Sequence, residues 1–352
     1  MLHCCFGRRA KRNAVMLVNK MVERKTFVSE IIERIAPKIG AKVLLEPEYG
    51  YVGQITFQNG KKVLFRDRNF NINPLGSSEI SRDKKYSDFF LKHFGYYTSE
   101  GQSFFSDKLN ERIKPKRTID DGYKYACKIG FPVIVKPNNL SQGTFVTKVF
   151  NKKEYYSVAK KIFSRVSVML VQRYYEGYDY RIVVLDDEII SAYQRIPLYI
   201  IGDGKSSVIR LIKQKQRTFR KIGRDTVIDI TDYRIPNKLK RLGLNWESVI
   251  IKNEKLYLLD NANLSTGGDA VDVTNIIHPD FKNLAINITK DMCLRMCGVD
   301  IITTEDISKP LKKYVIIEIN SAPGLDNYAS IGKKQKTIVD GLYLKVLKAL
   351  EK

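Results

Sequence analysis

Apolar residues recur along the chain in two patterns, as short runs of strand length and as longer stretches at helical spacing. An apolar run over residues 14–18 predicts a first strand, and helical spacing predicts a helix over 25–38. Three further strands are predicted, over 42–46, 51–57 and 62–65. Asn59-Gly60 stands between the last two and is a strong hairpin signal. The first 80 residues are therefore expected to form a small α/β domain.

The same patterns continue to the end of the chain without an internal repeat. Glycine ends the helices predicted over 83–94 and 118–129, since it readily adopts the backbone conformation that stops a helix. The later elements are strands at 103–105, 131–136, 144–149, 168–174, 180–185, 188–196, 299–303 and 314–320, with shorter strands near 249 and 257, and helices at 153–164, 206–219, 279–297 and 335–350. This order predicts mixed α/β and α+β structure.

Polar oxygen ligands gather on the last two predicted strands. Asp300 lies on one strand, and Glu318 and Asn320 lie on the next, where the two-residue period puts both side chains on one face. Oxygen ligands of this kind suit Mg²⁺, which takes one or two carboxylates together with waters and the phosphates of a nucleotide. An exposed row of acidic side chains is the alternative. Glu318 follows three apolar residues, however, and a charge in a buried strand requires a partner.

Two lysines are candidates for binding phosphate. Lys84 begins a predicted helix, and Lys136 ends a predicted apolar strand directly before the polar turn at 138–143. A lysine at such a position can place its charge on a phosphate group while backbone amides of the loop add hydrogen bonds. The alternative for either lysine is an ordinary solvated side chain.

The chain carries a large positive charge. It has 61 Lys and Arg residues against 38 Asp and Glu, a formal net charge of +23, so its surface should attract polyanions, nucleotides or an acidic substrate. Part of this charge lies between Lys205 and Arg224, where the basic residues form either a solvated helix face or a binding surface. The Gly204-Lys205-Ser206 sequence is not a nucleotide-binding P-loop, because Tyr199 stands where that motif requires glycine.

Apolar residues make up 43% of the composition and charged residues 28%, which excludes a wholly disordered chain. The purely apolar stretches are too short to span a membrane, and the N-terminus lacks the apolar region of a secretory signal. Five cysteines without a CxxC pair favour a reducing cytoplasm over a disulfide framework. Cys293 and Cys297, one turn apart on a predicted helix, are expected to be core residues, and Cys4 and Cys5 have no predicted role.

Six sequence blocks in a fixed order resemble the ATP-grasp ligases, more narrowly the ATP-grasp domains of cyanophycin synthetase and bifunctional glutathione synthetase. The blocks, which lie between Ser81 and Tyr328, are FPVIVKP, VQRYYEGYDYRIVV, IIGDGKSSVIRLI, NANLSTGGDAVDVT, GVDIIT and IIEINSAPGL. The resemblance implies an ATP-grasp fold, in which two α+β lobes sandwich ATP behind a small N-terminal α/β domain. The expected domains are 1–80, the N-terminal domain; 81–165, the small lobe; and 166–352, the C-terminal lobe with the Mg²⁺ site.

The resemblance also implies roles for individual residues. Those expected to bind ATP are Lys84 and Lys136 at the phosphates, Gly143 in the loop that follows, Gln172, Arg173 and Tyr175 at adenine, and Asp179 at the ribose. Asp300, Glu318 and Asn320 match the ligands of two Mg²⁺ ions. Arg181 and Arg195 match cations near the transferred phosphoryl group or the substrate carboxylate, and are the expected catalytic residues.

The implied activity is amide bond formation on an amino acid or peptide, through an acylphosphate made with ATP. The alternative is a basic protein that binds a polyanion or nucleic acid on an ATP-grasp scaffold without turnover, and a third possibility is a ligase whose basic segment recruits a large acidic substrate. Neither nucleic acid nor a membrane is the expected partner, and a homodimer is one option for the assembly. The N-terminal residues resemble the corresponding part of neither relative, which implies a stand-alone ligase. The chain departs from the family in the loop after Lys136, where Gly143 is the only glycine and Phe145 replaces another.

Overall fold

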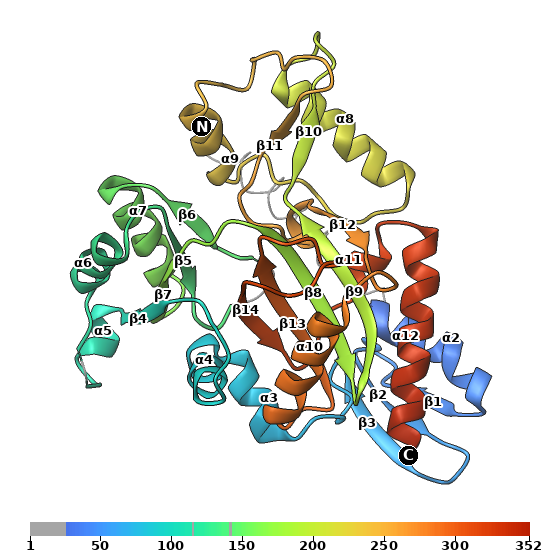
Figure 1. Ribbon diagram of the computed structural model, residues 1–352. Coiled ribbons are helices and arrows are strands. Elements are labelled where there is room, and N and C mark those ends of the chain that lie inside the picture. The colour runs from blue at the N-terminus through green and yellow to red at the C-terminus, as the bar shows by residue number, and fades with distance from the viewer. Residues whose placement is uncertain (1–25, 115, 141–142) are drawn as a thin grey trace, which may run out of the picture. The chain divides into compact units, whose positions relative to one another are not determined.

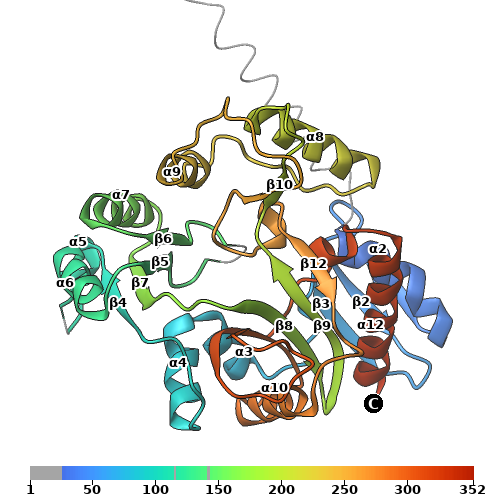
Figure 2. The same ribbon diagram turned by 45° about the horizontal axis from the view of Figure 1, so that its top comes forward.

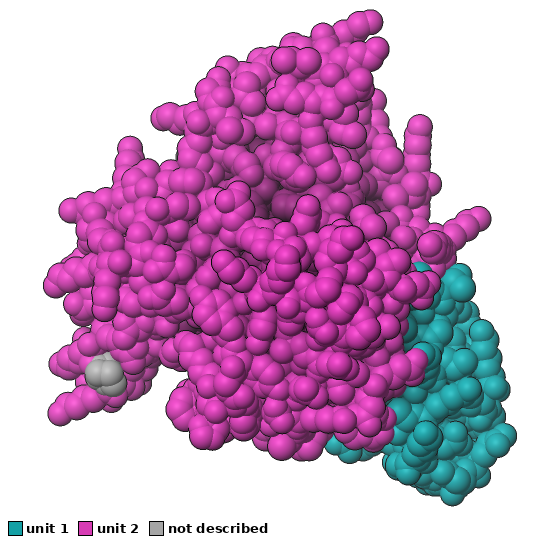
Figure 3. All heavy atoms as spheres, in the orientation of Figure 1, with its two compact units in different colours: residues 1–72, 337–352 teal, residues 73–336 magenta. Residues whose placement is uncertain are grey.

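The computed structural model describes residues 26–114, 116–140 and 143–352 (Figure 1). The described chain forms two compact units, which Figure 3 shows in different colours: residues up to 72 together with 337–352, and residues 73–336. The strand predicted over 14–18 and the residues Cys4 and Cys5 lie outside the described part. The division into domains at residues 80 and 165 stays a prediction, although the unit that contains the N-terminal sheet also takes in the last sixteen residues.

The first unit is built on a three-stranded antiparallel sheet in the order β1-β2-β3. Its elements are α2 (Phe27–Ile35), a 3₁₀ turn (Ala36–Ile39), β1 (Lys42–Leu45), β2 (Val52–Thr56), β3 (Lys62–Arg66) and most of α12 (Lys333–Glu351). The predicted hairpin is confirmed: Gly60 has φ +83°, a conformation that glycine adopts without steric cost. Arg34 on α2 and Asp340 on α12 form a two-point ion pair, with both N–O distances 2.6 Å.

The second unit begins with helices α3 (Leu75–Arg82) and α4 (Lys84–His93) and a four-stranded antiparallel sheet in the order β4-β7-β5-β6. The strands are β4 (Gly101–Phe105), β5 (Val133–Pro137), β6 (Thr147–Val149) and β7 (Val168–Arg173). One face packs against α6 (Ile119–Ile129) and α7 (Lys152–Phe163) through an apolar core that includes Val133 and Val135. Because side chains alternate along a strand, Lys136 belongs to the other face.

A five-stranded antiparallel sheet in the order β12-β9-β8-β13-β14 forms the largest layer of the second unit. Its strands are β8 (Tyr178–Leu185), β9 (Glu188–Ile196), β12 (Asp269–Asp272), β13 (Met296–Thr303) and β14 (Tyr314–Asn320). The apolar residues of one face, such as Ile182 and Val299, pack against α10 (Pro279–Asp291) in one buried core. The alternate positions, which face away from this core, include the charged residues Arg181, Arg195 and Asp300.

A separate group of elements, here called the helical module (residues 198–259), is inserted between β9 and β12. It contains β10 (Tyr199–Ile201), α8 (Val208–Lys221), α9 (Arg234–Arg241) and β11 (Lys255–Tyr257). Its own apolar core includes Leu211, Phe219 and Ile235. Helix α8 lies beside β10 in Figure 1 and again in Figure 2. The module is therefore a small packed body of its own rather than a loop.

The structure differs from the predicted elements in several places. Helices α3 and α9 and strands β10 and β12 were not predicted, and neither were the short segments α5 (Asp107–Asn110), α11 (Asp326–Ala329) and a 3₁₀ turn (Leu264–Thr266). The helix predicted to reach 297 ends at Asp291, because Cys293 has a left-handed φ of +53° and β13 begins at Met296. Cys293 is consequently exposed and only Cys297 is buried, so the prediction that both are core residues was wrong for Cys293.

None of the helices among the described residues combines the length and the apolar character that crossing a membrane would require.

Candidate functional site

Charged side chains form a row across the polar face of the five-stranded sheet. The strand register places Arg181 on β8 opposite Asp300 on β13, and Asp300 opposite Glu318 on β14. The register between β13 and β14 shifts by one residue directly after Asp300. This bulge allows Glu318 to share a face with Asp300 while Ile316, two residues earlier, stays in the apolar core.

Asp300 is bound by two arginines. Its carboxylate accepts hydrogen bonds from Arg181 Nε at 2.6 Å and Nη2 at 2.7 Å, and its Oδ2 lies 2.9 Å from Arg195 Nη1. Only 1% of Asp300 is exposed to solvent. Burial opposes the charge on Arg181, but the charge and hydrogen bonds of Asp300, together with smaller contributions from Tyr193 and Glu318, outweigh burial and raise the pKa of Arg181 well above its ordinary value. The cluster is therefore an ionised network inside the protein.

Glu318 lies among four cationic residues. Its carboxylate is 3.7 Å from Lys84 Nζ and 3.7 Å from Arg181 Nη2. Burial alone would raise the pKa of Glu318, but the charges of Lys84, Lys136 and Arg181, with a further contribution from Arg195, lower it far below the usual range. Glu318 is thus held as an anion, and the positive charge around it exceeds its own.

The two predicted phosphate-binding lysines come together near Glu318. Lys136 is 4% exposed, and its burial, only partly offset by the charge of Glu318, lowers its pKa to about 8. Lys84 Nζ donates hydrogen bonds to the carbonyl oxygens of Leu140 at 2.9 Å and Asn138 at 3.3 Å. Lys84 therefore lies against the residues that follow Lys136, and its contact with phosphate stays a prediction.

Asp83 fixes the start of α4 and so the position of Lys84. Its Oδ1 accepts hydrogen bonds from the backbone N–H groups of Lys85 and Tyr86, which caps the helix. Its Oδ2 accepts a hydrogen bond of 2.6 Å from Asn138 Nδ2. The helix end and the residue two positions after Lys136 are consequently held together.

The predicted magnesium ligands fit the ion only in part. Glu318 and Asn320 lie on one face of β14, and Nδ2 of Asn320 is buried without a hydrogen-bond partner among the described residues. Because the N and O atoms of an amide can be exchanged by turning it, Asn320 can present its oxygen at that point. Asp300 is already bound by two arginines, and in the described chain no three His, Cys, Asp or Glu side chains are grouped to hold a metal ion. One carboxylate and one amide still suit Mg²⁺ when phosphates complete its ligands.

The residues predicted to meet adenine lie at the end of β7 and just beyond it. Gln172 is 8% exposed, Arg173 pairs with Glu100 at 2.7 Å, and the Tyr175 hydroxyl accepts a hydrogen bond of 3.1 Å from the backbone N–H of Glu100. A cleft of about 510 Å³ opens beside this segment, lined by Tyr97, Tyr175, Glu176, Thr303 and Tyr314 among others.

Asp179, the predicted ribose ligand, is paired inside the protein. Its Oδ1 accepts hydrogen bonds from Arg195 Nε at 2.8 Å and Nη2 at 2.6 Å. Burial raises the pKa of Asp179, although Arg195 opposes that effect. The arginine thus bridges Asp179 and Asp300, and contact of Asp179 with ribose stays a prediction.

The basic segment is only partly a solvated surface. Arg224 is 2% exposed, and it donates hydrogen bonds to Asp269 and to the carbonyl oxygens of Leu264 and Gly268. Lys215 also pairs with Asp269, at 3.1 Å. These two cations hold the turn at 263–268 (NLSTGG) and the residue after it in place. The exposed basic residues of the segment include Lys213, Arg217, Arg220 and Lys221.

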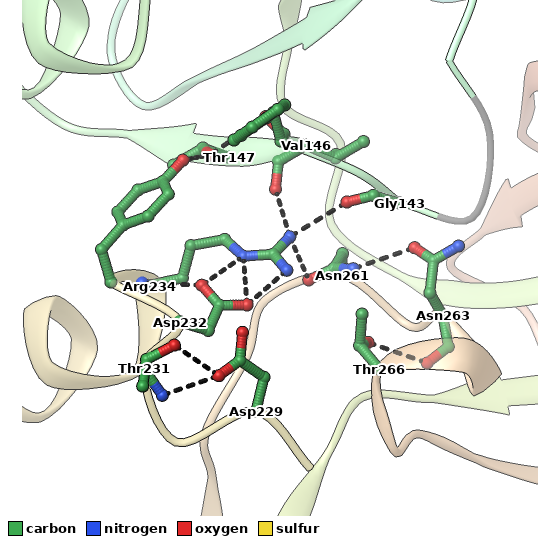
Figure 4. A network of polar contacts seen from close by, with 12 residues as sticks. Gly143, Val146, Thr147, Asp229, Thr231, Asp232, Arg234, Asn261, Asn263 and Thr266 are labelled. Atoms are coloured by element: carbon green, nitrogen blue, oxygen red, sulfur yellow. Dashed lines mark hydrogen bonds and ion pairs between the residues drawn. The ribbon is translucent and has the colours of Figure 1, made fainter. Parts of the chain in front are cut away.

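Sequence reasoning missed Arg234, at the start of α9. Its guanidinium contacts the backbone of Gly143 and Val146, a few residues after Lys136 (Figure 4). Gly143 itself occupies a position that requires glycine, because it has φ +69° and an added Cβ would lie 2.4 Å from Asn263 Oδ1, while its contact with ATP stays a prediction. The spacing of the buried residues Ile235 and Leu239 is the signal that could have revealed α9.

Comparison with known proteins identifies the class. The RimK-like ATP-grasp domain family matches residues 112–208 and 260–341, just over half of the chain, and the protein belongs to this family. The unmatched interval, 209–259, falls in the helical module. A cyanophycin synthetase from a Nostoc species is 39% identical over 204 residues, which are 55% of this chain and 22% of the relative.

Two bifunctional glutathione enzymes are also similar. The glutathione biosynthesis bifunctional protein of Clostridium perfringens is 30% identical over 201 residues, 55% of this chain and 26% of the relative. The crystal structure of a bifunctional glutathione synthetase from Pasteurella multocida aligns with a TM-score of 0.57 at 22% identity, covering 92% of this chain and 44% of that chain. The predicted ATP-grasp fold is confirmed, and the chain spans about a quarter of the length of the curated relatives.

Proposed function

We propose that the protein is an ATP-dependent ligase that joins a carboxylate to an amine, on an amino acid or peptide. The observation that carries this proposal is the convergence of Lys84, Lys136, Arg181 and Arg195 around the anionic Glu318. A transfer of phosphate to a carboxylate brings two anions together, and fixed cations lower the cost of that approach. Membership of the ATP-grasp family supports the use of ATP.

In the proposed reaction, the substrate carboxylate attacks the γ-phosphorus of ATP, ADP leaves, and an acylphosphate forms. An amine then attacks the acyl carbon, phosphate leaves with the bonding electrons, and the amine loses a proton to give an amide. Lys84 and Lys136 hold the phosphate groups, and Arg181 and Arg195 orient the carboxylate and balance the charge on the transferred group. Glu318 and Asn320 would hold Mg²⁺, with Asp300 beside them. The bound ion would neutralise charge on the phosphate oxygens.

The proposal also covers where the protein acts, which substrate it uses and how it assembles. The cysteine composition supports a cytoplasmic location. A small amino acid or peptide is the proposed substrate, and a homodimer the proposed assembly. The second candidate, binding of a polyanion without turnover, rests on the exposed cations of α8.

ADP release with Mg²⁺ and ATP tests the proposal, with single amino acids, pairs of amino acids and short acidic peptides as substrates and with mass spectrometry of the products. We expect one substrate set to give ADP together with a product of the mass of an amide. Binding of ATP without stimulation by any substrate, at any salt concentration, would favour the polyanion-binding candidate. An activity that falls steeply with salt would instead indicate electrostatic recruitment of a large acidic substrate by α8.

A further inference from the structure

Residues 143–146 form a turn that is unfavourable for its sequence. The N–H of Val146 donates a hydrogen bond of 3.2 Å to the carbonyl oxygen of Gly143, which closes the turn. Its third residue, Phe145, has φ +56°. At that position a turn with positive φ normally has glycine or asparagine, because the side chain of an L-residue crowds its own backbone there. Phe145 needs outside support to hold this conformation.

Arg234 provides contacts on both sides of Phe145. Its Nη1 donates hydrogen bonds to the carbonyl oxygen of Gly143 at 3.1 Å and to that of Val146 at 2.9 Å, as Figure 4 shows. The same nitrogen is 3.4 Å from Asn261 Oδ1. One guanidinium nitrogen therefore fixes the first and last residues of the turn.

Arg234 is itself held rigidly. Asp232 pairs with its Nε at 3.0 Å and with its Nη2 at 2.5 Å, and both side chains are largely buried, at 12% and 14% exposure. Tyr233, which lies between Asp232 and Arg234 in the chain, shares a hydrogen bond of 2.7 Å with Thr147. Three consecutive residues of the helical module thus hold the turn and the start of β6.

We propose that Arg234 is a positioning residue for the turn at 143–146, and that it stabilises this turn at a position where Phe145 stands in place of a glycine. This inference rests on the proposed function, because it takes that turn to lie near the ATP phosphates. Leu140, in the same loop, already accepts a hydrogen bond from Lys84. Residues 209–259 of the helical module, which the family match leaves out, then control how well the turn is placed for nucleotide.

Two measurements on Arg234→Met test the proposal. Hydrogen exchange of the full chain without nucleotide reports the turn directly, and we expect the amide of Val146 to exchange faster. Loss of charged hydrogen bonds of this kind should also raise the KM for ATP about tenfold, with a smaller change in kcat. Arg241→Met is the matched control, since Arg241 lies on the same helix and pairs with Glu154 and Asp260 instead of the turn.

The double variant Arg234→Met with Phe145→Gly separates positioning from general stability. Glycine adopts positive φ without steric cost, so the double variant should recover most of the lost ATP affinity and of the protection at Val146. Unchanged exchange at Val146 in Arg234→Met would overturn the proposal, and so would a failure of Phe145→Gly to restore anything. If the wild-type chain bound no ATP, the proposed function would fail, and the exchange experiment would still decide the role of Arg234.

Discussion

Asp300 and Arg181 lie directly opposite each other on β13 and β8 and form a two-point ion pair with distances of 2.6 and 2.7 Å. Because Arg195 binds the same carboxylate, one buried anion pairs with two arginines. Removing it leaves both guanidinium groups without that partner in a largely buried place. Asp300 therefore stabilises the fold, in addition to being a candidate metal ligand.

We expect Asp300→Asn to lower the free energy of unfolding by about 3 kcal/mol, the size found when one partner of a buried ion pair is removed. Urea denaturation followed by circular dichroism measures this loss. Asp306→Asn is the control, because Asp306 is exposed and bonds only locally, to Ser308. Equal stability of the two variants would contradict the ionised network described for this sheet.

Glu318→Gln should abolish ADP formation and leave the fold intact. The change keeps the shape of the side chain but removes the negative charge that the surrounding cations and the proposed Mg²⁺ require. We expect a loss of about a hundredfold or more in kcat, measured as ADP release at saturating ATP. The exposed Glu247→Gln variant is the control. A Glu318→Gln enzyme with normal turnover would remove Glu318 from the proposed site.

Binding of ATP should weaken as the pH rises through about 8. Burial lowers the pKa of Lys136 to about 8, so this lysine loses its charge above that pH, whereas an ordinary lysine keeps it until about 10.5. Equilibrium titration with nucleotide between pH 7 and 9.5 measures the effect. In Lys136→Arg the charge persists, and the weakening should be absent. A pH-independent affinity in the wild-type chain would show that Lys136 does not contact phosphate.

The same shift affects stability in the opposite direction. Between about 8 and 10.5 the unfolded chain keeps the Lys136 proton that the folded chain has lost, so folding releases a proton. The contribution of Lys136 to stability therefore rises with pH across this window. Across this window the affinity for ATP should fall while the contribution of Lys136 to stability rises. General alkaline unfolding would lower both quantities, so the two cases can be told apart.

Most elements with a clear apolar period were predictable from the sequence. The alternation in β8, β9, β13 and β14 comes from residues that pack into the core of the five-stranded sheet. The period of α6 and α7 comes from residues that pack into the separate core of the four-stranded sheet. The end of α10 was not predictable, because Met292 and Met296 continue a helical pattern that the left-handed Cys293 breaks. A positive φ at a residue other than glycine depends on tertiary contacts, and a single sequence does not show it.

The sequence motifs pointed to most residues of the candidate site, but they did not show which of these residues pair with one another. The motifs named Asp300, Glu318 and both lysines, and strand alternation put Glu318 and Asn320 on one face. The hydrogen bonds of Arg195 to Asp179, and of Arg234 to the turn at Gly143, join residues 16 and 91 positions apart. Such pairs are set by sheet register and by packing of the helical module, which have no local signature in the sequence.

Lys136 and Arg195 should differ in what their loss does to the enzyme. Lys136 lies beside Glu318 and Lys84 at the proposed phosphate position, so Lys136→Ala should raise the dissociation constant of ATP by about tenfold or more. Arg195 is held between Asp179 and Asp300, so Arg195→Ala should act mainly on the KM for the acid substrate and on kcat. Calorimetric titration with ATP and steady-state kinetics at fixed ATP separate the two effects. Unfolding curves of both variants are needed beside them, because Arg195 also balances buried carboxylates. If Arg195→Ala weakened ATP binding more than Lys136→Ala, the two cations would have exchanged roles, with Arg195 at the phosphates and Lys136 at the substrate.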